Sequence, residues 1–170
     1  MTTVTTPLGE LSGGVVVAAN VVAWLVWVMV VGYVAHVQPL RRVDHDTWLT
    51  RARRFEDGGR WYERVLRVKA WKDLLPEGGS FFKGGFAKRS VAGGDVDVMQ
   101  RFVAETRRAE YAHWVMMFGG LLFVPWNPWW ADVFNVVLGI AINAPCLLVQ
   151  RYNRLRLTRV LTRRNASGLS

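Results

Sequence analysis

The residues best suited to chemistry in this sequence are a carboxylate and an imidazole three positions apart, Glu110 and His113. From Asp97 onward the segment around them is rich in helix formers and has no glycine or proline, which predicts a helix. Residues three apart share a helix face, so the carboxylate can orient the imidazole and raise its basicity. Such a pair can act as a general base that takes a proton from a hydroxyl during acyl transfer. The alternative is a structural polar contact.

A metal-dependent mechanism is not expected. The Glu-x-x-His spacing also occurs in di-iron helix bundles, but those need a second copy of the motif and further glutamates. The chain has only three histidines, His36, His45 and His113, which excludes a desaturase-like cluster of histidine ligands. The single cysteine, Cys146, can form neither a disulfide nor a cysteine-based metal site within one chain. We therefore expect no metal and no cofactor.

Several other polar residues are candidates for substrate binding. The loop from Ser80 to Arg89 interleaves aromatic and basic residues among glycines, and its cations could hold phosphates of lipid head groups or of an acyl carrier. These cations are Lys83, Lys88 and Arg89. The loop matches no Walker or dinucleotide-binding pattern, and the alternative is a membrane-proximal loop with basic side chains that reach the interface. Glu105 and Arg108 lie on the predicted helix before Glu110 and should reach the same membrane face.

The last apolar segment carries a polar side chain in its middle, Asn143. An amide there is costly unless it bonds to another helix or to a ligand, and an interhelical bond is the favoured interpretation. Beyond the end of this segment, donors gather where a lipid head group, a glycosyl group or a carrier phosphate would lie. They are Gln150, Arg151 and Asn153. Anchoring of the helix by positive charge alone would explain the arginine but not the two amides.

The distribution of charge indicates what positions these residues. All 22 lysines and arginines lie in two blocks, residues 41–108 and 151–164. The run Gly13–Val37 contains no charged residue, and a helix of that length is longer than the ~30 Å hydrocarbon layer. It lacks the preceding positive charge of a cleaved signal peptide, so we interpret it as a retained span.

A second apolar region, Tyr111–Val149, is interrupted by the turn Trp126–Asp132, whose Asn-Pro breaks a helix and whose tryptophans suit a membrane interface. It predicts a helical hairpin. The first arm is short for a span, and the predicted helix that begins near Asp97 supplies the missing length.

Orientation follows from the rule that basic residues near spans stay in the cytoplasm. The predicted fold is therefore an all-α membrane protein with about three transmembrane helices, its N-terminus outside and its C-terminus inside. Residues 1–170 form one membrane domain, divided into a first span (13–37), cytoplasmic amphipathic helices with a glycine-rich basic loop (41–110), a hairpin (111–149) and a basic cytoplasmic tail (150–170). A soluble nucleic-acid-binding protein would not explain two charge-free runs, so no nucleic-acid partner is expected.

Several ordered motifs also resemble the glycosyl-4,4'-diaponeurosporenoate acyltransferase family, which consists of small bacterial membrane proteins. The motifs are Trp71–Pro76, Phe102–Trp114, Trp126–Pro128 and Asn143–Arg154. The resemblance implies transfer of a fatty acyl group from an acyl thioester, acyl-CoA as co-substrate, to a sugar hydroxyl of a glycosylated carotenoid. It also implies a bacterial membrane protein. Together with the spans and the charge distribution above, this leads us to expect a multi-pass protein of the bacterial plasma membrane with a cytoplasmic active face. The resemblance brings no catalytic residue, so Glu110 and His113 rest on side-chain chemistry alone.

Two further functions compete with a membrane acyltransferase acting on a lipid, a glycolipid or a glycosylated carotenoid. The first is a non-enzymatic accessory subunit of a larger membrane complex, whose partners would be other membrane proteins or copies of this chain. The absence of a His-x-x-x-x-Asp acyltransferase motif favours that alternative. The second, a lipid-binding or flippase-like protein, would need more polar residues along its spans and ranks last.

Overall fold

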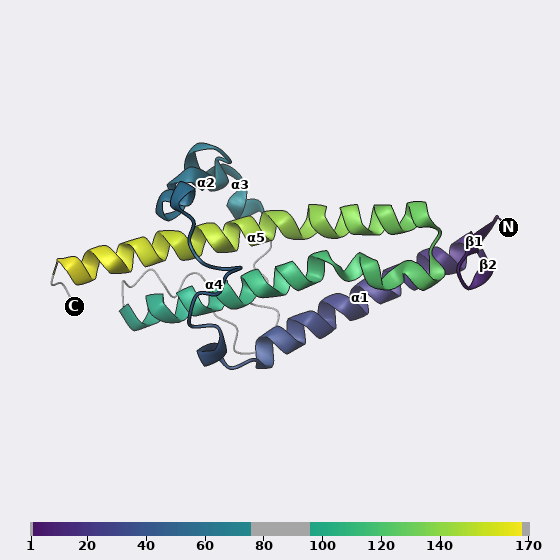
Figure 1. Cartoon of the computed structure of the whole chain (residues 1–170), viewed down its shortest axis with the longest axis horizontal. Coiled ribbons are helices and arrows are strands. Elements are labelled where there is room, and N and C mark those ends of the chain that lie inside the picture. The colour runs from purple at the N-terminus through teal and green to yellow at the C-terminus, as the bar shows by residue number, and fades with distance from the viewer. Residues whose placement is uncertain (1, 76–95, 168–170) are drawn as a thin grey trace. The chain divides into compact units, whose positions relative to one another are not determined.

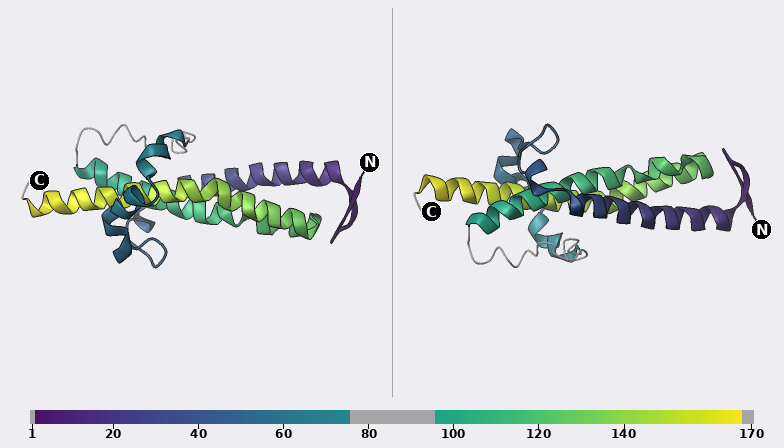
Figure 2. Two further views of the ribbon diagram at one scale, coloured as in Figure 1. Left: turned by 90° about the horizontal axis from the view of Figure 1, so that it is seen from above. Right: turned by 90° about the horizontal axis from the view of Figure 1, so that it is seen from below.

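The computed structural model describes residues 2–75 and 96–167. Within them the chain is mostly helical, and its long helices are α1 (Gly13–Val37), α4 (Val96–Met117) and α5 (Trp129–Ala166) (Figure 1). The mainly helical prediction is confirmed. It missed a small antiparallel hairpin of two strands, β1 (Thr3–Thr6) and β2 (Gly9–Ser12), at the N-terminal end of α1 (Figure 2).

The described part of the segment between α1 and α4, residues 38–75, contains two short α-helices, α2 (Arg60–Arg64) and α3 (Val68–Trp71). Both helices are short, five and four residues long. Arg67 separates the two helices with a left-handed φ of 47°, and Val65 is exposed whereas Val68 is buried. Packing of the individual side chains overrides the local helical pattern here. Short 3₁₀ turns also lie in this described part, at Leu40–Arg42, Arg54–Gly59 and Lys72–Leu74.

Among the described residues, α1 and α5 are long and apolar enough to cross a membrane, judged by length and composition. Helix α4 ends at Met117, and the chain continues as a 3₁₀ segment, Gly119–Trp126. The first arm of the predicted hairpin is thus not one α-helix. The number of spans and their orientation stay predictions.

The chain forms two compact units. The first unit comprises Met1–Val34 and Ala112–Pro145, and the second unit comprises Ala35–Tyr111 and Cys146–Ser170. Helices α4 and α5 contribute residues to both units, and residues 150–166, predicted as a tail, continue α5 as helix. The predicted division of residues 1–170 into one membrane domain with four parts stays a prediction.

Glycines allow close backbone contact inside the first unit. A Cβ atom at Gly120 would lie 2.8 Å from the backbone carbonyl carbon of Asn135, and one at Gly139 would lie 2.7 Å from the carbonyl oxygen of Met117. Both distances are far below van der Waals contact, so any side chain would force the backbones apart. The two glycines therefore fix how closely α5 packs against the 3₁₀ segment and the end of α4.

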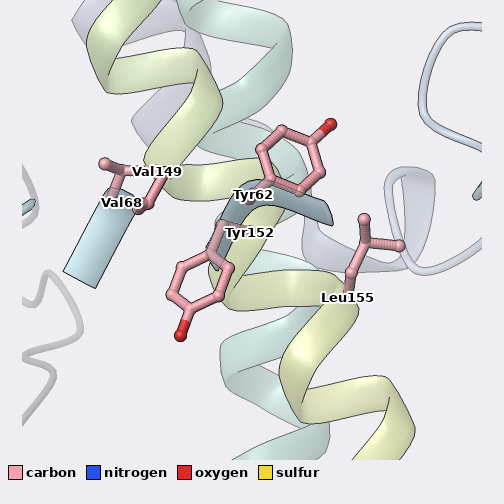
Figure 3. Close-up of a cluster of buried hydrophobic side chains, with 5 residues drawn as sticks. All are labelled: Tyr62, Val68, Val149, Tyr152 and Leu155. Carbon is pink, nitrogen blue, oxygen red and sulfur yellow. The ribbon is translucent and has the colours of Figure 1, made fainter. Parts of the chain in front are cut away.

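The core of the second unit lies where the short helices meet α5. Its buried apolar residues are Tyr62, Val68, Val149, Tyr152 and Leu155, and Figure 3 shows Val68 of α3 beside Val149 of α5. Val68 and Tyr152 are completely buried. Burial of side chains of this size contributes about 1.5–3 kcal/mol each. This core holds α2 and α3 against the second half of α5.

Candidate functional site

Charged side chains of the second unit form a connected cluster, here called the buried ion network. Its members are Asp46, Glu56, Arg107, Glu110, Arg151 and Arg154. Five of them are buried, and Asp46 is exposed. With three arginines and three carboxylates, the formal charges of the network cancel. A buried charge is costly unless it is paired, so this balance makes the cluster possible.

Glu110 lies at the centre of the network and is fully buried. Its Oε1 atom accepts a hydrogen bond of 2.6 Å from Arg151, and its Oε2 atom accepts bonds of 2.9 and 3.3 Å from Arg154. Both carboxylate oxygens are therefore occupied by guanidinium groups. The arrangement ties the second half of α5 to α4.

The arginines also bind the chain segment that precedes α2. Arg151 donates to the carbonyl oxygens of Leu49, at 3.1 Å, and Arg51, at 2.8 Å. Arg154 donates to the carbonyl oxygen of Thr50 and, at 3.2 Å, to Asp46. The network thus satisfies three carbonyl groups of the turn at residues 49–51 and docks residues 46–56 onto α5.

Glu56 is ionised in this environment. Burial alone would raise the pKa of its carboxyl, but hydrogen bonds from Arg151, from the Tyr62 hydroxyl and from the backbone N–H of Arg53 outweigh burial and hold the pKa below its usual value. The pKa of the Tyr62 hydroxyl is raised by its burial and by its hydrogen bond to Glu56. Neither group is therefore set to exchange a proton near neutral pH.

Two of the predicted binding residues are engaged with the protein itself. Glu105 and Arg108 form an ion pair on α4. Arg108 also donates to the carbonyl oxygens of His36, at 3.2 Å, and Gln38, at 3.4 Å, at the C-terminal end of α1. A cation in this position satisfies the last carbonyls of a helix and interacts favourably with its dipole.

The remaining predicted binding residues differ in how the structure places them. Arg151 is committed to the buried ion network. Gln150 and Asn153 are half-buried on α5, and their amide groups have no hydrogen-bond partner among the residues that the structure describes. They stay candidates for binding a ligand. The basic loop residues Lys83, Lys88 and Arg89 lie outside the described residues.

The imidazole of His113 makes its hydrogen bond to Asn143, within the first unit. His113 Nδ1 lies 3.0 Å from Asn143 Oδ1, and Asn143 Nδ2 donates to the carbonyl oxygen of Gly139 at 2.9 Å. Because this donation orients the amide, its oxygen faces the imidazole and must accept a hydrogen from Nδ1. The interhelical hydrogen bond predicted for Asn143 is confirmed.

A second asparagine on α5 supports this assignment of the hydrogen. Asn135 donates to the carbonyl oxygen of Ala131 at 2.9 Å, and its Oδ1 atom accepts a bond of 2.9 Å from Trp24 Nε1. An indole nitrogen can only donate, so the polarity of that bond is fixed. His113 and Asn143 repeat the arrangement two helical turns further along α5.

The hydrogen on Nδ1 leaves Nε2 of the neutral imidazole with a lone pair. Among the described residues Nε2 has no hydrogen-bond partner. The residue that orients His113 is thus Asn143, whereas the sequence indicated Glu110, three positions away on the same helix. The reason is that arginines occupy both oxygens of Glu110. The clue in the sequence was the costly amide of Asn143 in an apolar helix.

The glycosyl-4,4'-diaponeurosporenoate acyltransferase family matches residues 45–163, well over half of the chain. The chain belongs to this family. Proteins named glycosyl-4,4'-diaponeurosporenoate acyltransferase from Staphylococcus aureus strains MRSA252 and USA300 are each 30% identical to it over 107 residues. The protein of the same name from strain Newman is 29% identical over the same length. Each alignment covers 63% of this chain and 64% of the relative, slightly less than two thirds.

No solved structure is significantly similar to this chain. The region matched by the acyltransferase family contains the whole buried ion network and the His113–Asn143 pair, whereas α1 lies before it. The family is one of acyltransferases that act on carotenoid glycosides. Both clusters described above therefore lie in the part of the chain that carries the family relationship.

Proposed function

We propose that the protein is a membrane acyltransferase that moves a fatty acyl group from an acyl thioester to a hydroxyl of a glycosylated carotenoid or a related glycolipid. Family membership supports the reaction class and the type of acceptor. The observation that carries the assignment within this chain is the hydrogen bond from His113 Nδ1 to Asn143, which leaves the Nε2 lone pair available as a base. Acyl-CoA is the proposed donor, and no further cofactor is needed.

In this mechanism Nε2 of His113 takes the proton from the acceptor hydroxyl as its oxygen attacks the thioester carbonyl. The tetrahedral intermediate then collapses, and the bond between carbon and sulfur breaks. The thiolate leaves and takes the proton from the imidazolium, which yields an ester and a free thiol. A sugar hydroxyl is a poor nucleophile at neutral pH, and a positioned base contributes about 10²–10⁴-fold to such a step.

A membrane location suits the acceptor, and the first span supports it. Helix α1 contains no charged residue, and most of its apolar side chains are exposed; Val16 and Val31 are its buried residues. A continuous apolar surface of this size is stable against lipid or against another apolar protein surface. We place the protein in the bacterial plasma membrane, with the acyl-CoA site on the cytoplasmic side.

The direct test is acyl transfer by purified variants from acyl-CoA to a glycosylated carotenoid. His113→Ala should lower the rate by about 10²–10⁴-fold with its thermal midpoint close to that of the wild type. His45→Ala is the matched control, because His45 is exposed and should leave the rate unchanged. Near-normal turnover by His113→Ala would reject the catalytic assignment.

Variants of Asn143 test how the imidazole is held. Asn143→Asp keeps an acceptor for the Nδ1 hydrogen, whereas Asn143→Leu removes it at similar volume. The aspartate variant should therefore retain more of the rate than the leucine variant. Equal rates for both variants would show that the hydrogen bond between His113 and Asn143 does not contribute to catalysis. Wild-type protein without activity, purified together with another membrane protein, would favour the accessory-subunit alternative.

A further inference from the structure

Arg159 on α5 has a buried guanidinium nitrogen, Nη1, without a hydrogen-bond partner among the described residues. This distinguishes it from Arg151 and Arg154, whose donors meet carboxylates and backbone carbonyls within the buried ion network. A buried, charged donor that no protein group satisfies is costly, so native proteins seldom retain one without a reason. An acceptor from a ligand would satisfy Nη1.

A tight loop holds the stem of Arg159 in place. Three successive residues, Asp57, Gly58 and Gly59, have left-handed φ values of 47°, 56° and 93°. A Cβ atom at Gly58 would lie 3.1 Å from Arg159 Cδ, so the bare glycine packs directly against the side chain. Left-handed backbone at the non-glycine residue Asp57 is unfavourable and persists only where its surroundings impose it.

The carboxylates near this loop are engaged with other groups. Asp57 pairs with Arg60, at 3.2 Å, and Arg64, at 3.6 Å. Glu63 accepts hydrogen bonds of 2.9 Å from both Lys69 and the Tyr152 hydroxyl. These carboxylates therefore leave Nη1 of Arg159 unpaired, although Glu63 lies close enough for Arg159 to help lower its pKa.

Further positive charge lies along the same side of α5. Arg156 precedes Arg159 by three positions, and Arg163 follows it by four, which places all three on adjacent turns of one helix face. Arg156 and Arg163 are exposed. The face thus joins a half-buried guanidinium, one nitrogen of which has no partner among the described residues, to two solvent-exposed guanidinium groups, an arrangement that suits a ligand with a compact negative charge.

We propose that Arg159, assisted by Arg156 and Arg163, binds a phosphate group of a ligand. The planar guanidinium matches the oxygens of a phosphate, and such charge-assisted bonds are among the strongest in proteins. A coenzyme A thioester and an anionic phospholipid head group share this chemistry. Identification of the ligand as the acyl donor rests on the proposed function, whereas phosphate binding does not.

The first experiment measures binding of coenzyme A to the detergent-solubilised full chain by calorimetry, with pantetheine as the ligand that lacks phosphates. Coenzyme A should bind and pantetheine should not. Arg159→Gln should weaken binding by about tenfold or more, the effect of losing a charged hydrogen bond. Arg54→Gln makes the same charge change at an exposed site of the second unit and should bind normally.

The second experiment tests binding of an anionic lipid head group. Wild-type protein and Arg159→Gln are compared for thermal stability in nanodiscs of phosphatidylcholine with and without phosphatidylglycerol. Stabilisation by phosphatidylglycerol that is lost in the variant, without binding of coenzyme A, would support the phosphate site with lipid as its source. If Arg159→Gln behaves as wild type in both experiments, the proposal is overturned. Neither readout needs turnover, so the result is independent of the test on His113.

Arg159→Lys covers the case in which the glutamine variant does not fold. Lysine keeps the positive charge and the aliphatic stem beside Gly58 but lacks the planar fork of donors. It should fold and bind the phosphate ligand more weakly than wild type. Unchanged affinity in Arg159→Lys would overturn the role given to the guanidinium.

Discussion

Replacement of Glu110 by glutamine should destabilise the protein strongly, because the carboxylate compensates buried guanidinium groups. Glu110 accepts hydrogen bonds from Arg151 and Arg154 and is fully buried. Three arginines face three carboxylates in the wild-type network, so Glu110→Gln leaves one positive charge without compensation. Removal of one partner from a buried ion pair costs about 3–5 kcal/mol. That is a large share of a typical folding stability of about 5–15 kcal/mol.

The assay is chemical unfolding of the purified protein in detergent, followed by size-exclusion chromatography at each denaturant concentration. Glu10→Gln is the control: it makes the same chemical change at an exposed site on β2 and should shift stability by less than about 0.5 kcal/mol. Adding Arg154→Met to Glu110→Gln should cost less than the sum of the two single effects, since it removes the uncompensated charge. A loss below about 1 kcal/mol in Glu110→Gln would refute the structural role of the network.

Three other predictions concern packing, pH and topology. Gly120→Ala should destabilise the protein by about 1–3 kcal/mol, because its Cβ would lie 2.8 Å from the backbone of α5. Gly14→Ala is the control, because its Cβ would meet nothing closer than 3.8 Å and should be tolerated. The measurement is the thermal midpoint of each variant. The lowered pKa of Glu56 contributes stability that is present above the usual glutamate pKa of about 4.3 and lost as the pH falls through the folded-state value. The thermal midpoint of unfolding should therefore stay constant near neutral pH and fall at acid pH. A midpoint that does not fall at acid pH would contradict this prediction. Reporter fusions should place Gly58 in the cytoplasm and Asn127 outside, and an external signal at Gly58 would overturn the topology.

The long helices can be predicted from the sequence because the patterns that indicate them are local. The charge-free run Gly13–Val37 coincides with α1, and the glycine-free segment from Asp97 coincides closely with α4. The end of α4 at Met117 could not be predicted. Just beyond it, a Cβ atom at Gly119 would meet the Trp27 side chain and one at Gly120 would meet the backbone of Asn135, so the break depends on contacts with α1 and α5 that spacing within one segment does not reveal. The hairpin of β1 and β2 was missed for want of an alternating apolar pattern.

The candidate site was predicted in its residues but not in its pairings. Spacing along one helix suggested that Glu110 orients His113, yet both residues bind partners on α5. Sequence spacing detects neighbours on one element only, whereas a buried carboxylate takes whichever cations the fold brings to it. The same limit applies to Arg159, whose orphaned nitrogen is defined by what surrounds it in space.

The buried ion network also imposes an order on biosynthesis. Glu56 and Arg151 are 95 residues apart, and Asp46 and Arg154 are 108 apart. At a translation rate of about 5–20 residues per second, Glu56 waits about 5–20 seconds for Arg151 to be made. During that interval the loop before α2 has no arginine partners on α5 to hold it. Emergence of Arg151 and Arg154 from the ribosome is therefore the event that lets this part of the protein close, and chains truncated before Arg151 would expose an undocked segment to proteases.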